Sequence, residues 1–236
     1  MRYVVVDGNI GAGKTTLMSL LEARGLSVVT EPVDVWCSGY EHRGITETSP
    51  ISMYYEDPVR NAVPFQLHVL TTCVKKMTDA FDSAGDAPVV IERDPFDLDL
   101  FIEDNFREER FSAFEHRVFC DLVAAIRRLV PAERVGCVYL RLSPEKCLAR
   151  IRKRMRTAEM TIGLEYLTGL HDLHERKYDD PGCPSLIVDA SVPPGESADA
   201  VAEFVLGLQY APAAGTEEDR LPISSGSRSL SDSMVL

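Results

Sequence analysis

The chain has 236 residues, of which 45% are hydrophobic and 26% charged, a balance typical of a single globular domain and not of a disordered or fibrous protein. Its formal net charge is −12 at pH 7, which argues against a surface that binds nucleic acid through many phosphate contacts. A small anionic ligand needs only one local cluster of positive charge, so the placement of the 25 lysine and arginine residues matters more than their number.

The cysteines and the N-terminal segment bear on the compartment. The six cysteines form no C-x-x-C pair and have no close histidine partner, so we expect free thiols in a reducing compartment and no zinc site. Asp7 interrupts the first apolar run too early for a signal peptide, and no stretch of about 18 apolar residues is present to cross a membrane. The sequence therefore predicts a soluble cytoplasmic protein without a targeting segment and without a membrane or nucleic-acid partner.

Five short apolar runs alternate along the chain with segments of helical spacing. The runs cover residues 3–6, 26–29, 89–91, 138–142 and 186–188, and the longest helices are expected at 65–81, 96–107 and 111–130. This alternation is typical of an α/β fold with a buried parallel sheet. We expect one domain over residues 1–210 with a long insert at 31–88, and a disordered tail over residues 211–236, where little periodicity remains.

A glycine-rich motif follows the first predicted strand. Residues 8–15 read Gly-Asn-Ile-Gly-Ala-Gly-Lys-Thr and match G-x-x-x-x-G-K-[ST] between that strand and a helical stretch at 15–24. In such a loop, backbone N–H groups surround a phosphate, the lysine reaches the outer phosphates and the threonine hydroxyl binds Mg²⁺. The sequence therefore predicts an ATP or GTP site with Mg²⁺, formed by Gly8, Asn9, Ile10, Gly11, Ala12, Gly13, Lys14, Thr15 and Thr16.

Two acidic residues follow predicted strands. Glu31 ends the second strand before Pro32, at the edge where open α/β sheets bind ligands, and Glu92 ends the third strand before Arg93. The Glu31 carboxylate can take a proton from an acceptor hydroxyl, or it can merely cap a loop. Taken alone, this residue does not decide between the two.

A basic cluster lies at residues 150–156, where five positive side chains occupy seven positions. Arg150 and Arg154 share one face of the expected helix while Arg152 and Arg156 share another, so the charges do not form one solvated stripe. We favour a lid that binds an anion over a basic solvated helix or a nucleic-acid patch.

Two further helical segments carry weaker signals. His171 and His174 do not match a zinc motif and are expected on a helix surface. Segment 111–129 carries an apolar stripe that is either core or a subunit interface, made by Phe111, Phe114, Val118, Leu122 and Ile126.

The order of these motifs resembles one enzyme family. Together these motifs resemble those of the deoxynucleoside kinases of the insect multisubstrate, mitochondrial thymidine kinase and deoxycytidine kinase type. The motifs are the glycine-rich loop, Glu31-Pro32 with Trp36, Tyr55-Glu56-Asp57-Pro58, Pro64-Phe65-Gln66, Glu92-Arg93 and residues 150–156. The likeness runs from about residue 3 to 190. It implies a three-layer α/β P-loop kinase with a five-stranded parallel sheet, flanking helices and a small arginine-rich lid at about residues 150–160. It also implies a homodimer, because helices near 111–129 pair two subunits in the family.

The resemblance further implies a role for each candidate residue. Glu31 would be the base that takes the proton of the 5′-hydroxyl, Arg93 would hold it in line, and Glu92 would assist Mg²⁺ beside Thr15. Lys14, Arg150, Arg152 and Arg154 would contact ATP, and Arg154 with Arg156 would stabilise charge on the transferred phosphoryl group. The residues expected at the deoxynucleoside are Trp36 and Phe65 at the base faces, Gln66 at the base edge, Val69, Cys73 and Leu98 deeper in the base pocket, and Tyr55 with Glu159 at the sugar 3′-hydroxyl.

Two positions depart from the family pattern. Asp94 stands where a serine is usual, beside the expected reaction centre, and a later aromatic of the family falls on Phe101 or Ile102. The apolar lining of the base pocket favours thymidine, with deoxycytidine as a second substrate, over a purine. We therefore predict transfer of the γ-phosphoryl group of ATP to the 5′-hydroxyl of a pyrimidine deoxynucleoside, as in nucleotide salvage. A thymidylate-type nucleoside monophosphate kinase and a regulatory ATPase that needs no acceptor stay open as alternatives.

Overall fold

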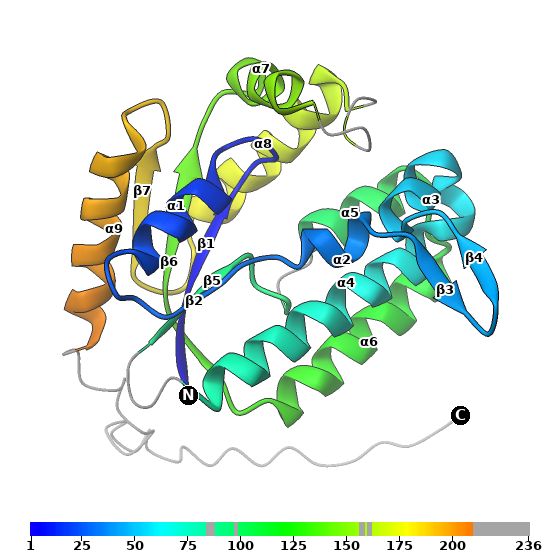
Figure 1. Ribbon diagram of the computed structural model, residues 1–236, viewed down its shortest axis with the longest axis horizontal. Helices are drawn as coiled ribbons and strands as arrows, with labels where there is room; N and C mark the ends of the chain where they lie inside the picture. The colour runs from blue at the N-terminus through cyan, green and yellow to red at the C-terminus, as the bar shows by residue number, and fades with distance from the viewer. Residues whose placement is uncertain (84–87, 97–98, 156–158, 160–161, 210–236) are drawn as a thin grey trace, which may run out of the picture.

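The computed structural model describes residues 1–83, 88–96, 99–155, 159 and 162–209 (Figure 1). Three predictions therefore fall wholly or partly outside the described residues. They concern Leu98 in the base pocket, Arg156 in the lid, and the tail at 211–236.

A five-stranded parallel sheet forms the centre of the molecule. Its strands are β1 (Arg2–Gly8), β2 (Val28–Val29), β5 (Val89–Glu92), β6 (Glu133–Arg141) and β7 (Ser185–Asp189), in the order β2-β5-β1-β6-β7. All neighbouring strands in this sheet run parallel. The predicted five-stranded sheet is therefore confirmed, and β1, the central strand, delivers the glycine-rich loop to the carboxyl edge.

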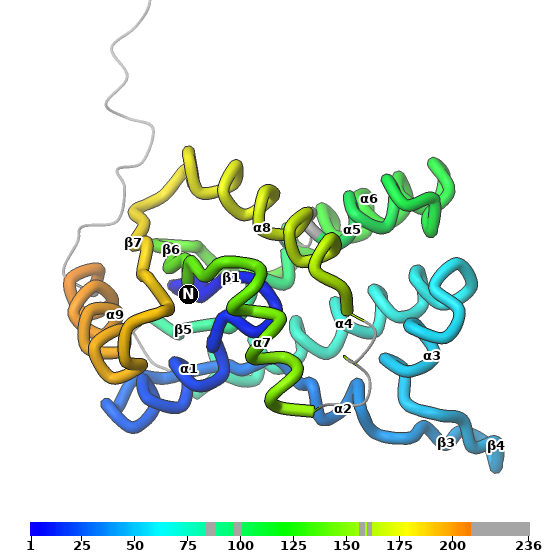
Figure 2. The backbone as a smooth tube through the Cα atoms, turned by 90° about the horizontal axis from the view of Figure 1, so that it is seen from above, coloured from blue at the N-terminus to red at the C-terminus, as the bar shows by residue number. Residues whose placement is uncertain are grey.

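Helices cover both faces of the sheet, as expected when parallel strands are buried on both sides. Val4 and Val6 of β1 pack in one cluster with residues of α1 (Lys14–Glu22) and α9 (Pro194–Gln209). Tyr3 and Val5 point the other way, into a cluster with residues of α4 (Pro58–Phe81) and α8 (Leu164–Asp179). Figure 2 shows α1 and α8 on opposite sides of β1. The three-layer architecture is confirmed.

The insert between β2 and β5 extends beyond one side of the sheet, and its long helix α4 also packs on the sheet (Figure 1). It contains α2 (Val33–Cys37), the hairpin of β3 (Tyr40–His42) and β4 (Ile45–Glu47), α3 (Pro50–Glu56) and α4. The predicted start of the long helix at residue 65 is wrong. Helix α4 begins at Pro58, where proline suits the first turn and the Asp57 side chain accepts a bond from Arg60 N, and it continues through Pro64.

Helix α6 (Ala113–Leu129) divides its apolar stripe between core and surface. Phe111, just before the helix, is buried, and Ile126 packs against the core. Phe114, Val118 and Leu122 are instead 77%, 48% and 37% exposed. The remaining helices are α5 (Asp99–Arg107) and α7 (Pro144–Arg154), and no helix in the described ranges is long and apolar enough to cross a membrane. The six cysteines, which all lie in those ranges, form no disulfide.

Candidate active site

The loop after β1 is shaped to surround a phosphate. Gly8 has φ 148° and Gly11 has φ 83°, and a Cβ atom on either would lie 2.7 Å from a backbone carbonyl oxygen, that of Leu140 or of Cys147. Only glycine fits these two positions without a shift of the backbone. The loop can therefore bring its own backbone close to an anion at the N-terminus of α1.

Lys14 lies inside this loop with 6% of its surface exposed. Its Nζ donates hydrogen bonds to the carbonyl oxygens of Gly8 at 2.8 Å and Asn9 at 3.1 Å. Burial, with the nearby positive charge of Arg93, lowers the pKa of Lys14 to about 8. A bound polyphosphate would supply the negative charge that this buried ammonium lacks.

Three acidic and basic side chains meet beside the loop because β2, β5 and β1 are neighbours in the sheet. Arg93 Nε lies 3.3 Å from Glu31 Oε1. Thr15 donates to Glu92 Oε1 at 3.1 Å, and Glu31 N donates to Glu92 Oε2 at 3.4 Å. Burial, followed by the charge of Glu31, raises the pKa of Glu92. The structure thus brings together the predicted base, its arginine and the predicted metal carboxylate.

Arg93 adopts φ 66°, which is uncommon for a residue other than glycine and orients its side chain toward Glu31. Its guanidinium lies 4.5 Å from the centroid of the Phe101 ring, and Phe101 lines the adjoining cavity. Ile102 is instead buried in the core at 3% exposure. The structure therefore assigns the later aromatic to Phe101.

Asp94 turns away from the reaction centre. Its carboxylate accepts hydrogen bonds from Tyr3 OH at 3.0 Å and from Phe96 N at 2.9 Å, and it lies 3.6 Å from Arg134. Tyr3 and Arg134 come from the beginnings of β1 and β6, whereas the glycine-rich loop follows the end of β1.

A cavity of about 470 Å³ extends from the glycine-rich loop into the insert, a size typical of small-molecule sites. The Phe65 ring packs edge-on against Trp36, with centroids 6.3 Å apart, and stacks on Tyr54 at 5.0 Å. Trp36 Nε1 donates to Thr72 Oγ1 at 3.0 Å, which holds the indole in place. The buried Gln66, with 4% exposure, also lines this cavity.

Most of the predicted site residues line this one cavity, and they come from six segments of the chain. They are Ile10, Gly11, Gly13, Lys14, Thr15, Thr16, Glu31, Trp36, Tyr55, Phe65, Gln66, Val69, Glu92, Arg93, Arg150, Arg154 and Glu159. Gly8, Asn9 and Ala12 belong to the loop but not to this wall. The sequence did not single out Val33, Ile51 or Ile162, which also line the cavity and whose apolar character alone does not distinguish them from core.

Two predicted residues lie off the cavity wall. Cys73 packs behind it in the cluster that contains Trp36 and Val69, and burial raises the pKa of its thiol. It lies one turn beyond Val69 on α4. Arg152 is exposed on α7 and donates to Ile162 O at 3.4 Å, because its position on the helix faces away from Arg150 and Arg154.

Helix α7 brings Arg150 to the glycine-rich loop and Arg154 to the cavity wall. Arg150 donates to Ala12 O and to Ala190 O, each at 2.8 Å, and so joins the glycine-rich loop to the end of β7. Arg154 forms an ion pair with Glu159, beside Tyr55. Burial, with the charges of Tyr54 and Glu159, raises the pKa of Tyr55, so this phenol stays protonated.

A second cavity of about 290 Å³ adjoins the first across Gly13, Thr16 and Arg150. Its other lining residues come from the glycine-rich loop, α1, β6, the segment after β7 and the start of α9, and they are Ala12, Leu17, Leu140, Ala190, Val192, Pro194 and Ser197. The sequence did not predict this cavity. The sequence pattern that bears on it is the predicted strand at 186–188, because the end of that strand reaches the same edge of the sheet as the glycine-rich loop.

His174 is buried at 1% exposure, so the prediction of a helix surface is wrong for this residue. Its ring contacts Leu170 O and the Asp7 carboxylate. Within the part of the chain that the structure describes, no three histidine, cysteine or acidic side chains are grouped to hold a metal ion by themselves.

Comparison with known proteins gives a consistent result. The family model for deoxynucleoside kinases matches residues 4–203. A thymidine kinase of Ictalurid herpesvirus 1 (strain Auburn) is 36% identical over 175 residues, which cover 72% of this chain and 71% of that protein. A probable deoxycytidine kinase of fowlpox virus (strain NVSL) is 30% identical over 176 residues, covering 74% and 71%. Human mitochondrial thymidine kinase 2 is 31% identical over 174 residues, covering 73% of this chain and 62% of that protein.

Solved structures share the fold. A deoxyadenosine kinase from M. mycoides with the products dCMP and a flexible dCDP bound superposes with a TM-score of 0.71. The match covers 88% of this chain and 100% of that one at 21% sequence identity. The same enzyme with bound dATP gives a TM-score of 0.70.

Proposed function

Because this chain belongs to the deoxynucleoside kinase family and is an ATP-dependent nucleoside kinase, we propose that its acceptor is a pyrimidine deoxynucleoside. Thymidine is the favoured substrate, and deoxycytidine is the second. The observation that carries this proposal is the aromatic cavity that runs from the carboxylate of Glu31, beside the glycine-rich loop, to the buried amide of Gln66.

The reaction centre suits an acceptor hydroxyl. Glu31 accepts the proton of the 5′-hydroxyl as its oxygen bonds to the γ-phosphorus of ATP and the bond from that phosphorus to the ADP oxygen breaks, so that ADP leaves. Arg93, 3.3 Å away, orients the carboxylate. Lys14 and Arg154 neutralise the charge that spreads over the phosphoryl oxygens. Most of the rate enhancement then comes from positioning the two substrates in line.

Mg²⁺ fits the residues beside Lys14. Mg²⁺ prefers oxygen ligands and keeps water and phosphate oxygens in its shell, and the Thr15 hydroxyl and Glu92 carboxylate lie 3.1 Å apart at the loop. We assign these two residues to the metal. When bound, the ion would neutralise charge on the β- and γ-phosphates.

The base pocket suits a pyrimidine edge. An amide both donates and accepts, so Gln66 can pair with the N3 and O4 atoms of thymine or the N3 and N4 atoms of cytosine. Trp36 and Phe65 provide faces on which a base stacks, and Val69 offers room for a methyl group. Tyr55 and Glu159 are the partners proposed for the sugar 3′-hydroxyl. The ion pair of Arg154 with Glu159 joins the sugar end of the site to the phosphate end.

The second cavity suits the base of the donor nucleotide. It opens behind the glycine-rich loop, next to where the donor phosphates lie, and Arg150 provides a planar cation that can stack on a base. We therefore assign the adenine of ATP to this cavity.

The exposed stripe of α6 suits a subunit interface. Phe114, Val118 and Leu122 present apolar side chains from successive turns of one helix, and such rows on a surface mark protein contacts. We propose that two copies pair through this face as a homodimer.

The acceptor is tested by comparing kcat/KM for the four deoxynucleosides with ATP as donor. We expect thymidine to have the highest value and deoxycytidine the next, while a clear preference for deoxyadenosine or deoxyguanosine would refute the assignment of the base pocket. Thymidine and its monophosphate are compared in the same assay. Faster turnover of the monophosphate would indicate the thymidylate-type alternative.

A further inference from the structure

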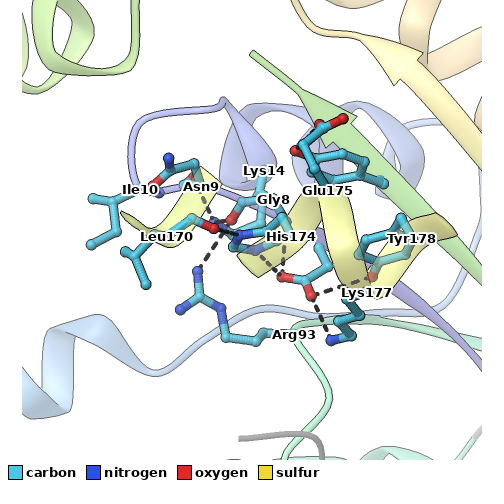
Figure 3. Close-up of polar contacts among 12 residues, drawn as sticks. Gly8, Asn9, Ile10, Lys14, Arg93, Leu170, His174, Glu175, Lys177 and Tyr178 are labelled. Carbon is cyan, nitrogen blue, oxygen red and sulfur yellow. Dashed lines mark hydrogen bonds and ion pairs between the residues drawn. The ribbon is translucent and has the colours of Figure 1, made fainter. Parts of the chain in front are cut away.

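A buried carboxylate lies directly below the phosphate loop and has no role in the reaction described above. Asp7, near the end of β1, is 1% exposed and accepts hydrogen bonds on both oxygens. Gly8 N lies 2.8 Å from Oδ1, while Lys177 Nζ and Tyr178 OH lie 2.9 Å and 3.2 Å from Oδ2. His174 and Lys177, both from α8, contact this carboxylate (Figure 3). These contacts hold the pKa of Asp7 well below its usual range despite burial, so the group is a carboxylate.

The geometry of His174 defines its protonation state. Its Nδ1 lies 2.7 Å from Leu170 O, and its Nε2 lies 3.3 Å from Asp7 Oδ1. A carbonyl oxygen and a carboxylate oxygen only accept, and a neutral imidazole carries a proton on only one nitrogen. A neutral ring would therefore direct a lone pair at one of the two oxygens. Both contacts are satisfied only if His174 is an imidazolium.

The backbone of Gly8, through the peptide groups on either side of its Cα atom, connects Asp7 to the reaction centre. Its N–H donates to Asp7, and its carbonyl oxygen accepts from Lys14 Nζ at 2.8 Å and from Arg93 Nη2 at 3.4 Å. Lys14 and Arg93 are the cations assigned to the phosphates and to Glu31. The negative charge of Asp7 favours the charged form of both side chains. Burial opposes it in each case, and in Lys14 burial and the charge of Arg93 outweigh it, so that the pKa is lowered. An unbalanced negative charge on Asp7 would attract Lys14 and Arg93 toward it and away from the phosphates and Glu31.

We propose that His174 is a positioning residue of the kinase reaction: as an imidazolium it neutralises Asp7 together with Lys177, and so leaves the charges of Lys14 and Arg93 to the phosphates and to Glu31. The proposal rests on the proposed function, since it needs those two cations to act in phosphoryl transfer. Helix α8 would then supply the two positive side chains, His174 and Lys177, that balance the negative charge of Asp7.

Several charged or titratable groups surround the ring. Tyr139 of β6 stacks on it with centroids 5.6 Å apart and planes 8° apart. On α8 itself the nearby groups are His171, Glu175, Lys177 and Tyr178, and Glu175 is occupied by Tyr139 OH at 2.8 Å and by Arg141. Asp7 is the acid that faces the ring, which explains why an imidazolium is stable at a buried position.

Two substitutions at position 174 separate the contacts of the ring. In His174→Gln the amide replaces the Nε2 donor to Asp7 without the charge, whereas in His174→Asn the shorter amide reaches toward Leu170 O and loses Asp7. We expect His174→Asn to lower kcat by about tenfold or more, and His174→Gln to lower it less, with the KM for thymidine changed by less than about threefold in both. His171→Asn, one turn earlier on α8, is the control and should leave kcat within about twofold.

The double variant Asp7→Asn/His174→Asn provides the decisive comparison. If His174 acts by balancing Asp7, removal of the carboxylate should restore part of the kcat lost in His174→Asn. A role in packing alone predicts that the double variant is as poor as His174→Asn or poorer, and this outcome would overturn the proposal. An unchanged kcat in His174→Asn would overturn it as well.

The protonation state is measured on the unaltered chain, so the test does not depend on a variant that folds. In ¹⁵N-histidine spectra recorded at the pH of the kinase assay, both ring nitrogens of His174 should carry protons. A ring nitrogen with a free lone pair would contradict the proposal. If the unaltered protein did not phosphorylate nucleosides, the proposed function would fail, while these spectra would still decide whether Asp7 is balanced by an imidazolium.

Discussion

Binding of ATP should raise the pKa of Lys14 and take up a proton. In the free protein the buried Lys14 has a pKa lowered from 10.5 to about 8, and the polyphosphate of ATP would return it toward its ordinary value. At about pH 8.5 the free ammonium is about one quarter protonated and the bound one almost fully, so about 0.75 proton is taken up per nucleotide. At about pH 7 the free group is already about 90% protonated, and the uptake falls to about 0.1.

Isothermal titration calorimetry measures this uptake. The observed binding enthalpy is plotted against the ionisation enthalpy of several buffers, and the slope is the number of protons exchanged. Lys14→Met provides the control, because it removes the group and leaves the titration of the nucleotide itself. An uptake that is the same at both pH values, or that persists in Lys14→Met, would refute the assignment of Lys14 as the buried phosphate ligand.

Three substitutions test other parts of the site and the interface. Glu31→Gln should lower kcat about 100-fold or more while ATP affinity measured by calorimetry stays within about threefold, because only the proton acceptor is lost. Arg154→Ala should lower kcat by about 100-fold and raise the thymidine KM much less in steady-state assays, and unchanged turnover would favour a merely solvated basic helix. Leu122→Glu should convert a dimer into a monomer in sedimentation velocity, since it places a charge in the apolar stripe of α6, whereas Arg117→Ala, on the exposed surface of the same helix, should not.

The parts of the fold that depend on local spacing were predictable. The match at residues 8–15 requires only a strand, glycines and a helix in succession, and the structure has β1, the loop and α1 in that order. The spacing alone does not show where α4 starts, because a proline such as Pro64 usually marks a helix boundary. Six residues of helix precede Pro64, and its missing N–H and its ring are accommodated on an exposed face.

The site residues were identified from their order along the chain, not from their contacts. Glu31 and Arg93 are far apart in sequence and meet because β2 and β5 are neighbours in the sheet, which no local pattern encodes. For the same reason the sequence could not show that Asp94 turns toward Tyr3 or that His174 reaches Asp7 across 167 residues. Cys73 was placed in the pocket by helical spacing from Val69, but spacing does not define where a cavity ends.

In the proposed reaction, ATP is consumed only to phosphorylate a nucleoside hydroxyl in the cavity between Glu31 and Gln66. ³¹P NMR of one reaction, with ATP and Mg²⁺ present and thymidine added in steps, tests this directly. We expect one ADP and one thymidine 5′-monophosphate for each thymidine consumed, and no ADP before thymidine is added. Formation of ADP at the same rate without any nucleoside would contradict it.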